Sequence, residues 1–311
     1  MTKRVAAVDC GTNSVRLLVA DVSGESLSDV ERRMEIVRLG QGVDRTGRLA
    51  PEALERTFTA MRGYAKLIEQ HAAEGRVPVR VVATSATRDA ANRDDFTAGV
   101  REIFGVDPEV ATGDEEARLS FTGATRGLAG GPVSDGAPYL VVDIGGGSTE
   151  FVVGSRSVEG ALSVDIGCVR LTERHLRDDP PGERAVEAAI ADIEAAMDRV
   201  EETVPVRRAR TLVGLAGSVT TVAGIALGLP AYDPARIHHS RIPAGRVHEV
   251  TGRLLRMTHD ERAAIPVMHP GRVDVIGAGA LILDRIVRRY GFSDVVVSEH
   301  DILDGIAWSL A

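Results

Sequence analysis

The chain has 311 residues, of which 45 are acidic and 37 are basic, giving a formal net charge of −8. This acidic balance argues against a general nucleic-acid binder, because affinity for a phosphate backbone comes from basic surface. The two cysteines, Cys10 and Cys168, exclude a disulfide framework and fit a reducing cytoplasm. No apolar run approaches the roughly 20 residues of a membrane helix, and the N-terminus leads directly into a strand, so we expect neither a membrane nor a nucleic-acid partner.

The first half of the chain predicts strands at about 3–10, 14–22, 27–38 and 79–83. A helix begins at Pro51, a residue suited to the first helical position, and a second helix covers 89–104. The first helix carries one apolar stripe at three- and four-residue spacing: Leu54, Phe58, Met61, Ala65 and Ile68.

The second half repeats this order after a loop at 130–138. The predicted strands are 139–144, 148–154, 157–165, 212–215 and 294–298, and the predicted helices are 167–177, 184–203, 245–257, 271–290 and 301–310. A further helix follows the strand at 212–215. The order strand, strand, strand, helix, strand, helix therefore occurs twice.

Two short segments of the chain match each other. Residues 8–14 are echoed by residues 142–148, with Asp, Gly and Ser at the same offsets. Apolar runs flank both, which predicts a strand, a tight turn and a second strand. Backbone N–H groups of such turns can bind phosphate, and Asp9 and Asp143 could each hold a divalent metal. One glycine-rich turn alone is weak support; the matched pair predicts these phosphate-binding residues: Gly11, Thr12, Asn13, Ser14, Gly145, Gly146, Gly147 and Ser148.

A third turn lies at 214–221, where a strand leads into a helix. Helix N-termini favour anions, so Gly217 and Ser218 are further phosphate-binding candidates; alternatively, Ser218 only caps the helix. Arg88 follows a buried strand and could bind phosphate bidentately, or it is solvated surface. His238 and His239 have no ligand partner at metal spacing and are expected to be structural or surface residues.

Two carboxylate positions could carry chemistry. The segment 112–119 opens a helix with acidic residues, which ordinarily complement the helix dipole. This helix start also lies where the chain passes from one repeat to the other, the position that a water-activating base would need. Glu150 follows the second turn and could ligate metal or order water, or serve only as a polar strand residue.

Together these residues resemble the exopolyphosphatase / guanosine pentaphosphate phosphohydrolase family of the actin, chaperone ATPase and sugar-kinase superfamily. The resemblance covers essentially the whole chain and is most specific at Gly-Asp-Glu-Glu-Ala (113–117) and Asp-Ile-Gly-Gly-Gly-Ser-Thr-Glu (143–150). Residues 8–18, 83–88, 214–221 and 298–305 also match. Thr12 stands where Ser is commoner and Ser218 where Thr is usual, and both keep the hydroxyl. The chain stops at 311, as short two-domain members do.

The resemblance implies an α/β fold of two ribonuclease-H-like domains with an interdomain cleft. The first domain would be 1–118 with the C-terminal helix 300–311, and the second 119–299. The resemblance also implies that Glu116 is the catalytic base. Asp143 and Glu150 would then serve the metal and the attacking water, with Asp9 as a further metal candidate. The expected cofactor is Mg²⁺, with Mn²⁺ as an alternative.

The resulting interpretation is an exopolyphosphatase that removes the terminal phosphate of short polyphosphate. The short-chain preference is expected from the 4% aromatic content, the charge of −8 and the chain's end at 311. The alternative is 5′-phosphate hydrolysis of guanosine pentaphosphate. Remoter alternatives are a sugar kinase, disfavoured because a paired-cysteine zinc signature is lacking, and a silent phosphate or nucleotide sensor or actin-like scaffold. A homodimer is left open.

Overall fold

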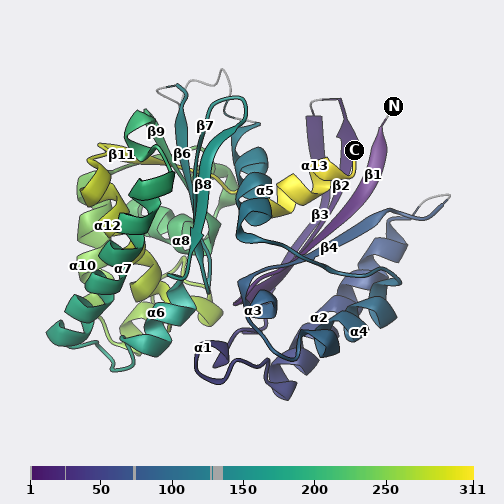
Figure 1. Ribbon diagram of the computed structural model, residues 1–311, viewed down its shortest axis with the longest axis horizontal. Helices are drawn as coiled ribbons and strands as arrows, with labels where there is room; N and C mark the ends of the chain where they lie inside the picture. Colours follow the sequence, from purple (N-terminus) through teal and green to yellow (C-terminus); the bar gives the residue numbers. More distant parts are fainter. Residues whose placement is uncertain (1, 25, 73–74, 127, 129–135) are drawn as a thin grey trace. The chain divides into compact units, whose positions relative to one another are not determined.

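The structure is a computed structural model that describes residues 2–24, 26–72, 75–126, 128 and 136–311. The chain divides into two compact units (Figure 1). The first comprises Met1–Gly123 with Ile302–Ala311, and the second Ala124–Asp301. This boundary and the one predicted at residue 118 both fall inside helix α5 (Gly113–Thr125), and the predicted domain limits remain a prediction. Most of the predicted loop at 130–138 lies outside the described residues.

The first unit is built on a five-stranded sheet in the order β3-β2-β1-β4-β5. Strands β1, β2 and β3 are antiparallel neighbours, and β4 and β5 run parallel to β1. Their bounds are β1 Lys3–Cys10, β2 Ser14–Ser23, β3 Ser26–Ile36, β4 Val79–Ala83 and β5 Glu109–Val110.

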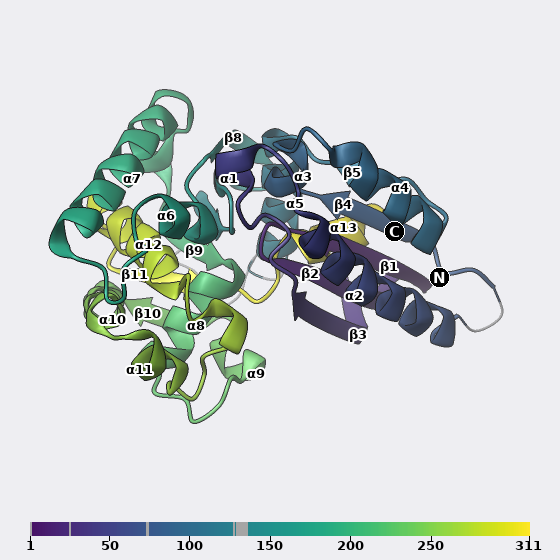
Figure 2. The same ribbon diagram turned by 90° about the horizontal axis from the view of Figure 1, so that it is seen from below.

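The central strand β1 is buried on both faces, because its alternate residues enter different cores. Ala6 and Val8 pack with α2 (Pro51–Gln70) and α4 (Arg93–Phe104), which lie side by side in Figures 1 and 2. Val5 and Ala7 pack on the opposite side with α5 and α13 (Ile302–Ser309). A central strand buried on both faces reads as a continuous apolar run, as Val5 to Val8 does.

The second unit is built on a six-stranded sheet in the order β10-β11-β9-β6-β7-β8. Strands β6 to β8 are antiparallel neighbours, β9 and β11 run parallel to β6, and β10 is antiparallel to β11. The bounds are β6 Tyr139–Ile144, β7 Thr149–Gly154, β8 Val158–Val164, β9 Thr211–Leu215, β10 Arg241–Pro243 and β11 Asp294–Val297.

The helices of the second unit share one large apolar core with its sheet. They are α6 Cys168–Arg174, α7 Glu183–Thr203, η1 Val206–Arg208, α8 Ala216–Ala226, α9 Pro234–Ile237, α10 Ala244–Arg256, α11 His259–Ala263, η2 Pro270–Arg272 and α12 Ile276–Tyr290. Helices α7, α10 and α12 gather on one side of this unit in both views (Figures 1 and 2). None of the described helices is long and apolar enough to cross a membrane.

The order β3-β2-β1-β4-β5 of the first sheet recurs as β8-β7-β6-β9-β11 in the second. The predicted fold class, α/β with two ribonuclease-H-like units, is confirmed. In both units the turn between the first two strands lies at the carboxyl end of the central strand, beside the end of the next parallel strand. Ligands of open α/β sheets bind at this edge.

Two predicted helices are shorter than expected. The helix predicted at 89–104 begins at Arg93, after a separate helix α3 (Ser85–Arg88). The break arises because Ala91 N–H donates to the Gly47 carbonyl and the Asn92 amide bonds both backbone groups of Leu49. The helix predicted at 271–290 likewise divides into η2 and α12. The short elements α1 (Val43–Thr46), α9, β10 and α11 were not predicted.

Candidate functional site

The two matched turns have the same local geometry. In the first, Gly11 N–H donates to the Ser14 carbonyl at 2.9 Å; in the second, Gly145 N–H donates to the Ser148 carbonyl at 3.0 Å. A Cβ at either glycine would lie close to the serine carbonyl oxygen, at 3.4 Å from Ser14 and 3.1 Å from Ser148. The repeat read from the sequence is therefore a repeat of backbone hydrogen bonding.

The carbonyl groups of the first turn are bound by the segment that follows β3. Val37 and Arg38 N–H both donate to the Asn13 carbonyl, and Gly40 N–H donates to the Thr12 carbonyl. A Cβ on Gly40 would lie 2.2 Å from Thr12 Cγ2, so only glycine fits this approach. The Thr12 hydroxyl is buried and lies 2.9 Å from the Ser85 hydroxyl.

The carbonyl groups of the second turn are bound by the start of α6. Cys168 N–H donates to the Gly145 carbonyl, and Val169 and Arg170 N–H donate to the Gly146 carbonyl. Arg170 Nε donates to the Gly147 carbonyl at 2.7 Å. The negative ends of these peptide dipoles thus face α6, which removes their repulsion from any anion at the other side of the turn.

The two turns differ in what faces their aspartates. Asp9 lies opposite Arg16 on the neighbouring strand, and Arg16 Nε and Nη2 donate to Asp9 Oδ2 at 2.9 and 2.6 Å. Asp143 instead lies opposite Glu150. Asp143 is 6% exposed and Glu150 1%, and Ser163 Oγ donates to Glu150 Oε1 at 2.7 Å.

Glu116 and Arg88, predicted separately, lie together in the first unit. Arg88 Nη1 donates to Glu116 Oε2 at 3.1 Å and to the Ala111 carbonyl at 3.0 Å. The Glu116 side chain is 9% exposed, whereas that of Glu115 is 43% exposed and pairs with Arg80. The buried, oriented carboxylate of this helix start is therefore Glu116, and Arg88 fixes its position.

The third turn does not contain the helix cap that was the alternative interpretation of Ser218. Helix α8 begins at Ala216 with Leu215 as N-cap and no side-chain cap, so the alternative reading of Ser218 as N-cap is wrong. Ser218 is packed instead between α6 and α12, because a Cβ on Gly279 would lie 2.1 Å from Ser218 Oγ. Arg272 Nη1 donates to the Gly217 carbonyl at 3.2 Å.

The model of the Ppx/GppA phosphatase family matches residues 18–311. The chain belongs to this family.

Two relatives and one solved structure illustrate the match. Exopolyphosphatase 2 of Mycobacterium tuberculosis is 52% identical, over 99% of this chain and 98% of that protein. A guanosine-5′-triphosphate,3′-diphosphate pyrophosphatase of Aeromonas hydrophila is 28% identical, over 98% of this chain and 59% of that protein. The crystal structure of an exopolyphosphatase-like protein has a TM-score of 0.92 at 43% identity, covering 99% of this chain and 98% of the other.

The aspartates of the two turns differ in their suitability for a divalent cation, because Asp143 lies opposite the carboxylate of Glu150 whereas Asp9 lies opposite Arg16. Like charges directly opposite each other on antiparallel strands are destabilising, so Asp143 and Glu150 are the carboxylates that could hold a cation in the second unit. Asp9 already faces the guanidinium of Arg16. Across the described ranges, no group of three or more His, Cys, Asp or Glu residues could hold a metal by itself. Mg²⁺ commonly uses only one or two carboxylates together with substrate oxygens.

Both thiols are buried and free of disulfides. Burial raises the pKa of the Cys10 thiol well above its usual value, and the charge of Asp9 raises it further. Burial also raises the pKa of Cys168, although the Ser218 hydroxyl and the charge of Arg272 act in the opposite direction. Since the thiolate is the nucleophilic form, neither cysteine is suited to nucleophilic chemistry.

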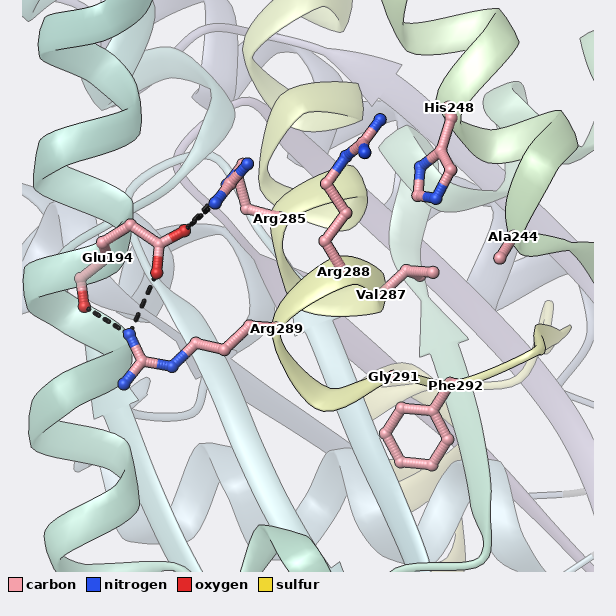
Figure 3. A pocket seen from close by; sticks show the side chains of 9 residues that line it. All are labelled: Glu194, Ala244, His248, Arg285, Val287, Arg288, Arg289, Gly291 and Phe292. Atoms are coloured by element: carbon pink, nitrogen blue, oxygen red, sulfur yellow. Dashed lines mark hydrogen bonds and ion pairs between the residues drawn. The ribbon is translucent and has the colours of Figure 1, made fainter.

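The second unit also has an open pocket of about 700 Å³ away from the turns (Figure 3). It lies where α12 ends and β11 begins, at the amino end of a strand parallel to β6 and β9, whose carboxyl ends carry the turns. Its arginines are paired with acids: Arg285 and Arg289 with Glu194, and Arg288 with Asp284. Because these charges are paired, the pocket does not form a cationic site.

Four residues that contact the candidate site residues or their turns were not predicted from the sequence: Arg16, Ser163, Tyr232 and Arg272. A signal for Arg16 was present, because it stands at the offset from Asp9 that Glu150 has from Asp143. Tyr232 donates to Thr220 Oγ1 of α8 at 2.8 Å. Arg272 contacts the third turn although it is far from that turn in the sequence. Their positions depend on tertiary packing and had no local signal.

Proposed function

We propose that this chain is a Mg²⁺-dependent exopolyphosphatase that releases the terminal phosphate of short polyphosphate chains. The observation that carries the proposal is the buried Asp143–Glu150 pair beside a glycine turn whose carbonyls face α6. Such a site favours a hard cation and the phosphate oxygens that accompany it. The relative named exopolyphosphatase 2, 52% identical over nearly the whole chain, supports the same activity.

Glu116 is the proposed base. Its carboxylate takes a proton from water as the water oxygen attacks the terminal phosphorus. The bond from that phosphorus to the bridging oxygen breaks, giving orthophosphate and a chain one unit shorter. Arg88 keeps the carboxylate oriented through its 3.1 Å contact. Mg²⁺ bound beside Asp143 and Glu150 would supply positive charge for the phosphoryl oxygens.

The turn residues are proposed to bind phosphate through their backbone N–H groups, as the turns at 11–14 and 145–148 share one geometry. Asp9 contributes less as a metal ligand in this proposal, because Arg16 occupies its Oδ2. The two free thiols support a reducing cytoplasm as the compartment.

Guanosine pentaphosphate is the second candidate substrate. The pyrophosphatase relative of Aeromonas hydrophila supports it, and so does one structural observation. Tyr232, 37% exposed, is held beside α8 by its bond to Thr220, and aromatic side chains are common partners of nucleobases. The net charge of −8 disfavours long polyanions, which supports short chains over long ones.

The test is turnover of tripolyphosphate, long-chain polyphosphate, guanosine pentaphosphate and ATP, at equal concentration of terminal phosphate. The proposal expects the largest kcat/KM for tripolyphosphate, with strong sensitivity to salt. If guanosine pentaphosphate has the largest kcat/KM, the second candidate replaces the first. If none of the four is hydrolysed with Mg²⁺ or Mn²⁺, both are wrong.

A further inference from the structure

Gly305, in α13, lies against the backbone of α5, the helix that begins with Glu116 in its first turn (Figure 1). A Cβ on Gly305 would lie 2.1 Å from the Leu119 carbonyl oxygen and 2.7 Å from the carbon of that carbonyl. Close C–H···O contacts in proteins have carbon and oxygen about 3.3–3.6 Å apart, so a side chain at 305 would push the two helices apart by roughly 1 Å. Glycine at this position is therefore what lets α13 approach α5.

This contact falls one helical turn after the candidate base. Leu119 follows Glu116 by three residues, and an α-helix has about 3.6 residues per turn. Glu116 belongs to the same hydrogen-bonded helix, because its N–H donates to the Thr112 carbonyl at 2.9 Å. Its carboxylate is held at only 3.1 Å from Arg88 Nη1. A displacement of the α5 backbone at Leu119 therefore also displaces the Glu116 carboxylate.

Helix α13 is itself anchored on the sheet of the first unit. Arg32 Nη2, from β3, donates to Asp304 Oδ1 at 2.5 Å, and the Asp304 side chain is 2% exposed. The apolar residues of α13 pack in one core with Val5 and Ala7 of β1: Ile302, Leu303, Ile306 and Ala307. Breaking a buried ion pair is strongly destabilising. Helix α13 therefore resists displacement, and α5 takes up the movement when the two are pushed apart.

The core that contains α13 supports Arg88 as well as Glu116. Leu119 and Ala111 both belong to this core. Arg88 Nη1 donates to the Ala111 carbonyl at 3.0 Å in addition to its contact with Glu116. The carboxylate is thus supported through Leu119 of its own helix, and the guanidinium that orients it is supported through Ala111. Both sides of the Arg88–Glu116 contact depend on how closely α13 packs.

We infer that Gly305 is a positioning residue for Glu116. Its lack of a side chain sets the distance between α13 and α5, and so holds the Glu116 carboxylate where it can take a proton from water. The inference rests on the proposed function, because it takes Glu116 as the base. It also gives a role to the end of the segment 298–305, which has no part in the proposed binding of phosphate or metal. Gly305 acts through α5 and needs no contact with the substrate.

Two variants and a matched control test this role. Gly305→Ala adds a methyl group against the α5 backbone. Asp304→Asn weakens the anchor of α13 without adding volume, and it decides the question if Gly305→Ala does not fold. The control is Gly99→Ala in α4, where a Cβ would lie 2.3 Å from the Phe58 ring, in the core on the other side of the sheet. This control overpacks the same unit away from α5.

The readouts are kcat and KM for tripolyphosphate, Tm, and the calorimetric Kd of imidodiphosphate, whose P–N–P bridge is not hydrolysed. Gly305→Ala should lower kcat by roughly 10- to 100-fold, because a misplacement of about 1 Å in a catalytic site has an effect of this size. KM and the imidodiphosphate Kd should stay at their wild-type values. Asp304→Asn should lower kcat by a smaller factor, and Gly99→Ala should lower Tm without changing kcat.

Two further measurements separate positioning from a loss of stability. The acidic limb of the kcat–pH profile should move to higher pH in Gly305→Ala, because a carboxylate further from the Arg88 guanidinium is protonated more easily. In the Glu116→Gln background, Gly305→Ala should lower kcat no further, because the carboxylate that it displaces is already absent.

The role of Gly305 is overturned if Gly305→Ala has the kcat and the pH profile of Gly99→Ala; where only Asp304→Asn folds, the same comparison decides. A rise in KM and Kd with unchanged kcat overturns it too, as do effects of Gly305→Ala and Glu116→Gln that multiply. Failure of the proposed function is seen in the wild type itself, which would then release no orthophosphate from tripolyphosphate, whereas failure of this inference leaves wild-type turnover intact.

Discussion

Glu150 faces Asp143 directly across the antiparallel strands β6 and β7. Both side chains are buried, so two carboxyl groups share a low-dielectric environment at the end of the glycine turn. At the equivalent position of the first unit, Arg16 faces Asp9 and neutralises it. The duplicated turns therefore differ in the charge of the residue that faces their aspartate, from which we expect a bound cation to matter more for the second unit than for the first.

We expect Glu150→Gln and Asp143→Asn to raise Tm in the presence of EDTA, because each replaces one of two buried carboxyl groups that face each other with a neutral amide. The same variants should need a higher Mg²⁺ concentration for half-maximal activity, since a carboxylate ligand is lost. Thermal unfolding with EDTA and activity titrated with Mg²⁺ measure the two effects.

Asp9→Asn is the matched control in the first unit. It should lower Tm with or without EDTA, because it breaks the Asp9–Arg16 ion pair, whose aspartate side chain is 3% exposed. If Asp9→Asn and Glu150→Gln change Tm in the same direction in EDTA, the electrostatic difference between the turns is refuted.

Gly40→Ala should lower activity and stability together. A Cβ there would lie 2.2 Å from Thr12 Cγ2 and 3.1 Å from the Ala86 Cβ, so the first turn must move. Overpacking of this kind costs about 1–3 kcal/mol. Gly63→Ala is the control, since a Cβ at this exposed position of α2 meets nothing within 4 Å. Denaturant unfolding should show the control as stable as wild type or more so; equal stability of the two variants would contradict the packing argument.

Stability should fall when the pH drops below about 6.5, partly through His239. Burial and the neighbouring charge of His300 lower the pKa of His239 in the folded chain. The unfolded chain then binds more protons between 6.5 and the lower folded pKa, and folding loses free energy across that window. His239→Asn, whose new residue tolerates the left-handed φ of +61°, should show a smaller loss of Tm between pH 7.5 and 5.5.

His259→Asn, an exposed substitution in α11, controls for the loss of one histidine. An unchanged pH dependence of Tm in His239→Asn would show that the half-buried imidazole of His239 does not contribute.

Much of the fold could be predicted because the information is local. The turns combine small residues with flanking apolar strands, and alternate residues of β1 enter two cores. The helix start at Pro51 was also correct. Element limits failed where tertiary hydrogen bonds decided them, as at Asn92, whose side chain bonds Leu49 and delays the start of the expected helix to Arg93.

The candidate site was only partly predictable, for a related reason. Glu116 and Arg88 could each be named from sequence, but their ion pair joins residues of different elements. Arg272 lies in η2, a short element that the sequence pattern did not predict as separate from the helix that follows. Its position against Gly217 depends on how η2 packs on α8. When tertiary packing alone brings a residue to a site, no periodicity or spacing in the sequence predicts its position there.

The central claim is that the buried carboxylate of Glu116 activates water for phosphoanhydride hydrolysis. Its most direct test is the rate of orthophosphate release from tripolyphosphate with saturating Mg²⁺, for wild type, Glu116→Gln and Glu115→Gln, with circular dichroism showing that all three fold. We predict that Glu116→Gln lowers kcat by roughly 10²–10⁴-fold, while Glu115→Gln, an exposed partner of Arg80, stays close to wild type. Near-wild-type kcat in Glu116→Gln, or loss of activity in Glu115→Gln alone, would contradict the claim.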